Sequence, residues 1–341
     1  MQIVSAKAYI PIRLPFPRED IDWLTNGAIR QILSLSGKIH LSRERLVFVK
    51  IRKISEREAR QILASHHRFE RFRNSTILEF SAEVEFREAD WKLEPPYDTP
   101  QDKRAIFESV IESEFAFLTH QIAIAANIAR PGSIHTLPGY MFYNGRFNKQ
   151  IRGLMSSLEM LFSFKSKEER PKLKLLRIAN VWQWLVELDD FHSGFGITPL
   201  GRGLAAFSYI FTSEFGDESP LDDLWAIVAL ESLYESNGSQ RELMERARLF
   251  LDQPKNDKSI IHDIYKNRSK LIHGGMNLPF SFGDNDGLPE VEQFRAKSMR
   301  FWDTSIPIMI ATFQRMAELK IYQIKFELRI VRQSQILKRV N

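Results

Sequence analysis

The sequence contains no cysteine among its 341 residues, and this absence excludes disulfide bridges, thiolate metal sites and a cysteine nucleophile. It also lacks any run close to the ~20 apolar residues that a helix needs to cross a bilayer. The first residues do not show the basic-then-apolar pattern of a signal peptide. From these absences we expect a cytoplasmic protein that does not contact membranes.

Common catalytic motifs are missing too. The chain has no P-loop, no G-x-G-x-x-G segment after a strand and no G-x-S-x-G turn. His66 and His67 stand among arginines, which would repel a metal cation, and His135 and His192 lack an acidic or histidine partner at metal-ligand spacing. We therefore expect no metal and no other cofactor.

Positive charge is abundant, and it is unevenly placed. The net charge is +5, while residues 38–73 alone hold 11 Lys and Arg against 4 Asp and Glu, and residues 313–341 hold 7 against 2. Such segments are typical of proteins that approach a nucleic-acid backbone, although ordinary solvated surfaces can have the same composition. The charge is compatible with RNA as a partner but does not identify it.

Hydrophobic patterning predicts an α+β fold whose architecture changes near residue 100. β-Branched and aromatic residues indicate three strands before this point, and a charged segment between the second and third strands indicates a helix. The predicted strands are Gln2 to Leu14, Arg45 to Ile54 and Ser75 to Arg87, and the predicted helix is Ser55 to Phe72. The proline-rich segment Leu93 to Pro100 fits neither element and marks a linker.

After the linker, apolar residues recur mostly at helical spacing. Pro307 is expected to kink or break the last helix, and a hairpin is predicted at Tyr143-Asn-Gly-Arg146. The basic tail from Lys320 to Arg339 could be a helix or a strand, and the alternation that starts at Ile321 favours a strand. The predicted helices are residues 102–130, 151–164, 171–188, 199–214, 221–234, 241–251, 260–273 and 290–316.

These patterns divide the chain into four regions. With 43% hydrophobic residues, a chain of this length can bury a core in each of two domains. We expect a β-rich N-terminal domain over residues 1–98, a helical connecting region over 99–197, a helical bundle over 198–316 and a basic C-terminal tail over 317–341.

Residues 264–275, Ile-Tyr-Lys-Asn-Arg-Ser-Lys-Leu-Ile-His-Gly-Gly, form the most informative motif. Arg268 precedes His273 by five residues, and the glycine pair marks the expected end of a helix. Around this helix Arg268 falls within an apolar arc, on a face that should be buried, so its permanent charge needs a partner. The arc consists of Ile261, Ile264, Leu271 and Ile272.

The spacing of the motif separates its two functional side chains. Five residues place His273 about 140° around the helix from Arg268, so one straight helix does not bring them together. Convergence could come from the long arm of Arg268, from unwinding of the last turn, or from a two-fold axis that brings a second copy of the helix alongside. We favour the two-fold axis.

A partner for Arg268 is predicted upstream, on the segment Pro220 to Glu235. This segment is apolar on every side between Leu224 and Leu230, as is typical of a central helix, and it carries Glu231. Burying a lone charge costs several kcal/mol, so an ion pair between Glu231 and Arg268 would relieve both side chains.

Together these segments resemble a known family. Three segments follow one another in the same order as in HEPN domains of the Apea-like type, which this chain resembles. They are a helix with the pattern Leu-Trp-Ala-x-x-Ala-Leu-Glu-Ser-Leu-Tyr, an amphipathic helix from Arg241 to Leu251, and the motif Ile-Tyr-Lys-x-Arg-Ser-Lys-Leu-Ile-His-Gly-Gly. The resemblance covers Thr198 to Phe313. It implies a HEPN-like helical bundle with an Arg-x4–6-His ribonuclease motif, acting as a homodimer through the HEPN helices, with Arg268 and His273 as the catalytic residues.

The implied reaction is cleavage of RNA by its own 2′-hydroxyl, which leaves a 2′,3′-cyclic phosphate and a 5′-hydroxyl end. His273 would move the proton, because imidazole titrates near pH ~6.5, and Arg268 would stabilise charge on the phosphate oxygens. Glu231 would orient Arg268. Ser269 and Tyr265 could orient the phosphate or simply support the fold.

Other interpretations stay open. Arg268 and His273 could merely staple a helix end, where a cation is favoured. The protein could also be a non-catalytic HEPN dimer, acting as a binding or scaffolding module for a protein or nucleotide partner. By resemblance, the nuclease would serve prokaryotic anti-phage defence or act as a toxin, with an antitoxin or a phage-derived trigger as a further partner. A loop from Phe280 to Pro289 would cover the site until the trigger acts.

Overall fold

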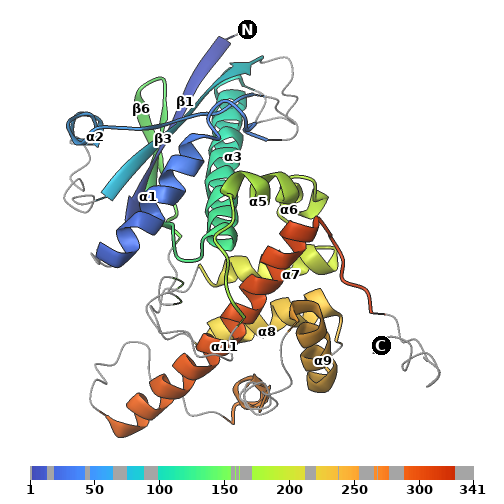
Figure 1. The fold of residues 1–341 in the computed structure, drawn as a ribbon. Coiled ribbons are helices and arrows are strands. Elements are labelled where there is room, and N and C mark those ends of the chain that lie inside the picture. Colours follow the sequence, from blue (N-terminus) through green and yellow to red (C-terminus); the bar gives the residue numbers. More distant parts are fainter. Residues whose placement is uncertain are drawn as a thin grey trace.

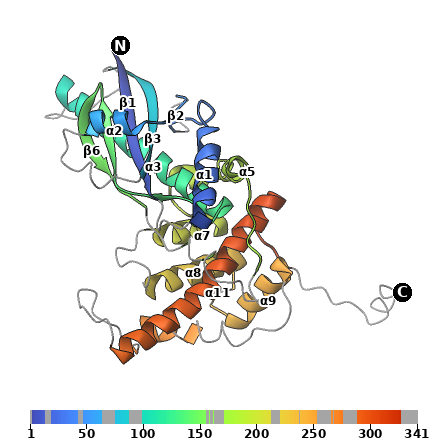
Figure 2. The same ribbon diagram turned by 60° about the vertical axis from the view of Figure 1, so that its left-hand side comes forward.

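The computed structural model describes residues 2–13, 19–42, 47–63, 75–87, 99–154, 158, 161, 171–211, 220–236, 238–252, 265–266, 268–275 and 288–326. The chain is an α+β protein, with an antiparallel sheet and its helices at one end and a group of helices at the other (Figure 1). Figure 2 shows the same division from another side. The expected α+β class is confirmed. In the described part of the chain no helix is long and apolar enough to cross a membrane.

The sheet is built around β1 (Gln2–Arg13). β3 (Ser75–Phe86) pairs with β1 along its whole length, from Gln2 opposite Phe86 to Arg13 opposite Ser75. β2 (Lys50–Lys53) pairs with the outer side of β3. All of these pairs are antiparallel, and the three strands lie within the segments that the sequence predicts as strands.

Three strands from beyond residue 100 complete the sheet on the other side of β1. The φ angles of Asn144 (46°) and Gly145 (79°) are both positive, as in a type I′ turn, and this confirms the predicted hairpin. Because β5 pairs with β1, the sheet extends past the boundary expected at residue 98. The strands are β4 (His135–Thr136), β5 (Gly139–Tyr143) and β6 (Arg146–Ile151).

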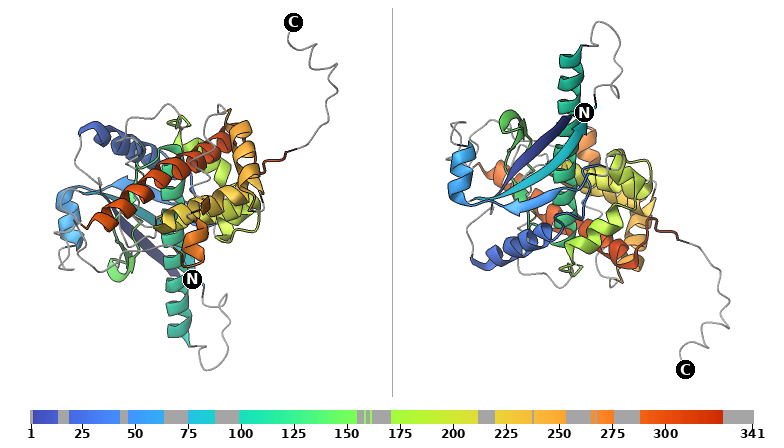
Figure 3. Two further views of the ribbon diagram at one scale, coloured as in Figure 1. Left: turned by 90° about the horizontal axis from the view of Figure 1, so that it is seen from below. Right: turned by 90° about the horizontal axis from the view of Figure 1, so that it is seen from above.

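One face of the sheet is fully covered. Alternate residues of β1 and β3, such as Ala6 and Phe80, are buried together with apolar residues of α1 (Glu19–Leu33) and α3 (Pro100–Ala129). Figure 3 shows α3 passing along the strands. Every second residue of β3 on this face, from Leu78 to Phe86, is buried, as expected for a strand with one face against a core.

The other face of the sheet is covered in part by α2 (Glu56–Leu63), whose Ala59 packs with Tyr9 of β1. Glu79, on this face of β3, departs from the expected pattern because its side chain is only 3% exposed. Arg52 of β2 neutralises it, with the guanidinium Nη2 2.5 Å from a Glu79 carboxylate oxygen.

Local sequence explains where the sheet-covering helices start and stop. Thr99 and Asp102 form a capping box at the start of α3, and the C-cap residue Arg130 is soon followed by Gly132, whose φ is positive. α1 is not among the helices predicted from the sequence. Its signal is present, since Leu24, Ala28, Ile29 and Ile32 recur at helical spacing and are buried.

The helices at the other end surround α8. α8 packs against α7, α9 and α11. Its residues Ala226, Ile227, Ala229 and Leu230 are buried, so the prediction of a central helix is confirmed. In chain order the helices are α5 (Ile178–Leu185), α6 (Asp189–Ser193), α7 (Pro199–Tyr209), α8 (Pro220–Tyr234), α9 (Gln240–Leu251) and α11 (Pro289–Leu319).

α11 runs unbroken through Pro307, so the expected break at this residue is wrong. Proline inside a helix costs about 3 kcal/mol because it donates no hydrogen bond and crowds the preceding turn. Ile306, Met309 and Ile310 flank it and are fully buried. Burying each such side chain contributes roughly 1.5–3 kcal/mol, which offsets the cost of the proline.

Some predicted boundaries also differ from the structure. Ile151 ends β6 instead of opening a helix, and residues 171–177 are not helical, so that α5 begins only at Ile178. Residues 321–326 do not form the strand predicted for the tail. The rest of the tail and almost all of the predicted 280–289 loop lie outside the described residues.

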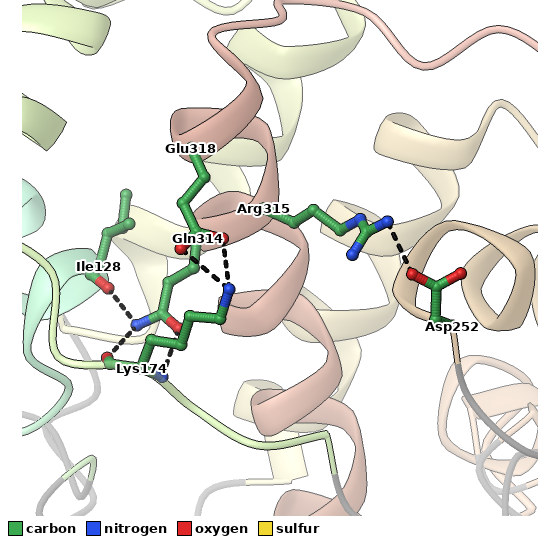
Figure 4. A network of polar contacts seen from close by, with 6 residues as sticks. All are labelled: Ile128, Lys174, Asp252, Gln314, Arg315 and Glu318. Atoms are coloured by element: carbon green, nitrogen blue, oxygen red, sulfur yellow. Dashed lines mark hydrogen bonds and ion pairs between the residues drawn. The ribbon is translucent and has the colours of Figure 1, made fainter.

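Gln314 of α11 ties the two ends of the molecule together (Figure 4). Its buried amide nitrogen donates to the carbonyl oxygens of Ile128 and Lys174, at 2.8 Å each, and its amide oxygen accepts from the backbone N–H of Lys174 at 2.9 Å. On the outside, the Lys174 ammonium pairs with Glu318 at 2.7 Å. One cluster of buried hydrophobic residues runs from Val4 to Ile324, so the sheet and the helices share a core.

Candidate functional site

The last turn of α8 supplies the carboxylate of the candidate site. Glu231 lies between Leu230 and Leu233, which are each 1% exposed, and its own side chain is 15% exposed. A carboxylate this deep needs compensating donors, because desolvation disfavours its charge. Two donors reach it from the segment that carries the sequence motif.

Arg268 is the first of these donors. Residues 265–266 and 268–272 are helical, and Arg268 Nη1 lies 3.1 Å from Glu231 Oε1. The ion pair predicted from the sequence is therefore present. The Arg268 side chain is 28% exposed, so one side of its guanidinium group faces the carboxylate while part of it is open to solvent.

Tyr265 is the second donor. Its hydroxyl donates to the same carboxylate oxygen of Glu231 at 2.8 Å, and the Arg268 guanidinium lies 5.8 Å from the centre of its ring. Burial, followed by the hydrogen bond to Glu231, raises the pKa of the Tyr265 hydroxyl above its ordinary value. Tyr265 therefore stays protonated and acts as a donor that holds Glu231.

The Glu231–Arg268 pair leaves part of the arginine's donor capacity unused. Arg268 Nε is buried and has no hydrogen-bond partner within the described residues. A guanidinium group carries five N–H donors, and this ion pair occupies one nitrogen. The arrangement thus fixes the arginine while leaving donors for an anion.

The helix ends at His273 in the way the glycine pair predicts. The N–H of Gly274 donates to the carbonyl of Leu271 at 3.3 Å, and the N–H of Gly275 donates to Lys270 at 2.7 Å, which together make a Schellman motif. Gly274 adopts a φ of 68°, the left-handed conformation that this motif needs. His273 immediately precedes it and is exposed.

The structure separates the predicted site residues into two groups. Glu231, Tyr265 and Arg268 form one cluster, as predicted for Glu231 and Arg268, whereas the link through Tyr265 was not anticipated. His273 and Ser269 lie on exposed surface. The signal for the Tyr265 contact is its spacing of one turn before Arg268, which points both side chains toward the same neighbour.

The apolar arc predicted around Arg268 is only partly present. Leu271 is half-buried, but Ile272 is 54% exposed in the single chain, contrary to the expectation that it faces the core. Its burial would need a surface that one copy does not provide at this position. Ile261 and Ile264 lie outside the described residues.

The basic segment 38–73 is partly neutralised where the structure describes it. Arg52 pairs with Glu58 and Glu79, and Arg60 pairs with Glu56. The arginines in these ion pairs are therefore less available to bind a nucleic acid. The segment therefore combines structural ion pairs with solvated charge.

Comparison with known proteins gives no further identification, since no protein-family model, no curated protein and no solved structure matches this chain.

Proposed function

We propose that this protein is a metal-independent endoribonuclease whose helical part, residues 198–316, is a HEPN-like bundle. The observation that carries the proposal is the arrangement around Arg268. A half-buried carboxylate on the central helix fixes Arg268, and five residues after this arginine an exposed histidine stands at a glycine-terminated helix end. Both groups are of the kind that metal-free RNA cleavage requires.

The reaction proceeds by attack of a 2′-hydroxyl on the adjacent phosphate. Because nucleophile and phosphate belong to the same nucleotide, part of the entropic barrier is already met by the substrate. His273 takes the proton from the 2′-hydroxyl or gives one to the departing 5′-oxygen. Arg268 donates to the non-bridging oxygens, where negative charge develops. The products are a 2′,3′-cyclic phosphate and a 5′-hydroxyl end.

A homodimer would complete the site. Arg268 and His273 project from different sides of their helix, so one copy does not aim both at a single phosphate. Ile272 and His273 are neighbouring exposed residues, and a second copy packed there would bury the isoleucine. The two-fold axis would then place the motif of one copy opposite that of the other.

The second candidate is a non-catalytic HEPN dimer that binds a protein or nucleotide. Its support is that Arg268 already has a carboxylate partner in the single chain, as expected of a structural ion pair. In this case His273 would contribute only to the helix end.

Fragment-end analysis separates the two candidates. Purified wild type, Arg268→Ala, His273→Ala and the control Lys266→Ala, which alters an exposed residue of the same helix, are incubated in EDTA with a single-stranded oligoribonucleotide and its DNA counterpart. We expect wild type and the control to cut RNA alone and to leave 2′,3′-cyclic phosphates. Equal cleavage by His273→Ala, or cleavage of the DNA, would contradict the proposed reaction.

A cellular test addresses the proposed defence or toxin role. Induced wild type should slow bacterial growth, whereas His273→Ala at equal abundance should not. Equal toxicity of both proteins would argue against RNA cleavage as the cause.

A further inference from the structure

Three arginines from separate segments gather at the boundary between the sheet and the helices. Arg30 lies in the last turn of α1, Arg130 is the C-cap residue of α3, and Arg177 immediately precedes α5. α1, α3 and α5 contact one another pairwise. In Figure 1, α5 and the lower end of α3 lie between the sheet and the helices around α8, away from the short orange helix at the bottom that carries Arg268.

Specific contacts bring the backbones of these arginines together. The N–H of Leu176 donates to the carbonyl of Ala129 at 2.9 Å, which places Arg177 next to Arg130. The N–H of Ile178 donates to the side-chain oxygen of Gln31 at 2.8 Å, which places the same segment beside the end of α1. The backbone segments that carry the three arginines are therefore neighbours in space, although they lie far apart in the sequence.

Arg130 lies against α1. Its Nη1 is 3.2 Å from the position that a Cβ would take at Gly27, so the absence of a side chain at Gly27 makes room for the guanidinium group. Arg30 follows Gly27 by three residues and so lies on the same side of α1. Burial and then the positive charge of Arg30 lower the pKa of Arg130, as expected for two cations held close together.

The three arginines lack the partners that other arginines of this chain have. Arg104, Arg246 and Arg268 are 23–28% exposed, and each lies within 3.2 Å of a carboxylate oxygen. Within the described residues, Arg30, Arg130 and Arg177 take part in no ion pair, and Arg130 Nε is buried without any hydrogen-bond partner. Like charges held close together without an acid repel one another. The C-terminal ends of α1 and α3 offset part of this repulsion, and a bound anion would offset more of it.

The segment around Arg177 is held in place. The hydrogen bonds from Gln314 to Ile128 and Lys174 fix the backbone two residues before Arg130 and three residues before Arg177 (Figure 4). Lys174 is paired with Glu318, so it does not compete for the anion. A preorganised cluster loses less conformational entropy on binding than flexible side chains would.

We propose that Arg30, Arg130 and Arg177 form a phosphate-binding site that docks the RNA backbone away from the Arg268 motif. Guanidinium groups match phosphate oxygens in shape and charge. The positive end of the α5 dipole at Arg177 favours the same anion. The choice of RNA as the source of the phosphate rests on the proposed function.

The test measures binding without cleavage. Fluorescence anisotropy gives the Kd of the full-length protein for a 2′-O-methyl oligonucleotide, which cannot be cut by its own 2′-hydroxyl, at several salt concentrations. The double variant Arg30→Gln/Arg130→Gln should bind roughly tenfold more weakly, and its salt slope should fall by about 1.4, since each lost contact to a single strand contributes ~0.7. The single variant Arg177→Gln, at an exposed position, should lower the slope by about half that amount.

A matched control has the same loss of charge elsewhere. Arg87→Gln removes an arginine already paired with Glu85, and its Kd and salt slope should equal those of wild type. Circular dichroism confirms that each variant is folded. Arg177→Gln keeps the proposal testable if Arg130→Gln perturbs the fold.

Inorganic phosphate separates the two sources of the anion. If phosphate raises the Tm of wild type but not of the double variant, while oligonucleotide binding is equal in both, the site takes free phosphate and RNA docking is wrong. If neither measurement changes in the variants, or if wild type does not bind the oligonucleotide, the proposal is overturned. The assay does not use cleavage, so an inactive motif and an absent docking site give different results.

Discussion

At the residue scale, one carboxylate oxygen organises the candidate site. Glu231 Oε1 accepts from both Tyr265 and Arg268, so each of the three side chains limits the freedom of the other two. The sequence predicts the Glu231–Arg268 pair because two isolated charges in neighbouring buried helices are hard to tolerate. It does not predict Tyr265 as a donor, since that role depends on how the two helices are rotated.

Removing the Tyr265 hydroxyl tests this network. Tyr265→Phe leaves the ring in place but deprives Glu231 of one donor, and we expect the free energy of unfolding to fall by about 1 kcal/mol. Urea unfolding measures the change. In a Glu231→Gln background the same substitution should cost less, and an equal cost in both backgrounds would show that the bond to Glu231 is not the cause.

His120 gives a residue-scale prediction for pH. Its Nε2 lies 3.1 Å from the carbonyl oxygen of Arg152, and burial lowers its pKa despite this hydrogen bond. The unfolded chain, with an imidazole pKa near ~6.5, then binds more protons than the folded one as the pH falls below that value. The free energy of unfolding should therefore decrease from pH 7 toward pH 5.

The variant His120→Gln isolates this contribution. It keeps a donor for the Arg152 carbonyl but cannot gain a proton, so its Tm should fall less between pH 7 and pH 5 than that of wild type. Thermal melts at the two pH values measure the difference. Identical losses in both proteins would assign the pH dependence to other groups.

At the element scale, helix ends are well specified by the sequence and helix packing is not. Thr99 with Asp102, and Gly274 after His273, act through their immediate neighbours, so the corresponding boundaries of α3 and of the motif helix are predictable. The helix break predicted at Pro307 is wrong because it depends on distant contacts and not on immediate neighbours. The burial that keeps α11 intact comes from side chains of distant segments, which a local rule does not include.

The two glycines after His273 provide an element-scale test with a built-in control. Gly274 has a φ of 68°, so Gly274→Ala should lower the free energy of unfolding by about 1 kcal/mol and loosen the helix end that carries His273. Gly275 lacks a positive φ, and a Cβ there would meet its nearest neighbour at 3.8 Å, so Gly275→Ala should be nearly neutral. Equal effects in urea unfolding would contradict the assigned turn.

At the scale of the whole molecule, the division into regions is the part least accessible from the sequence. The change near residue 100 is real as a change from strands to α3, yet β5 returns to pair with β1, and β6 pairs with β5. The pairing joins residues more than a hundred positions apart, and no local pattern encodes it. Arg30, Arg130 and Arg177 are likewise brought together by contacts between distant segments, so no local sequence motif predicts their proximity.

Gln314 should matter for the cohesion of the whole molecule. Gln314→Leu removes three hydrogen bonds and leaves buried backbone groups of Ile128 and Lys174 unpaired, so we expect a loss of about 3 kcal/mol in the free energy of unfolding. Lys174→Met removes only the exposed pair with Glu318 and should cost less than about 0.5 kcal/mol. Comparable losses in urea unfolding would contradict this account.

The central place of β1 also has a consequence in time. During synthesis β1 is made long before β5, whose Tyr143 pairs with Ala6. At the usual synthesis rate of ~5–20 residues per second, roughly ten seconds pass between the completion of β1 and the completion of both strands that pair with it, β3 and β5. Throughout this interval it is an alternating apolar strand with at least one unpaired edge, with which other chains could pair. A nascent copy therefore relies on chaperones most before the hairpin of β5 and β6 has emerged.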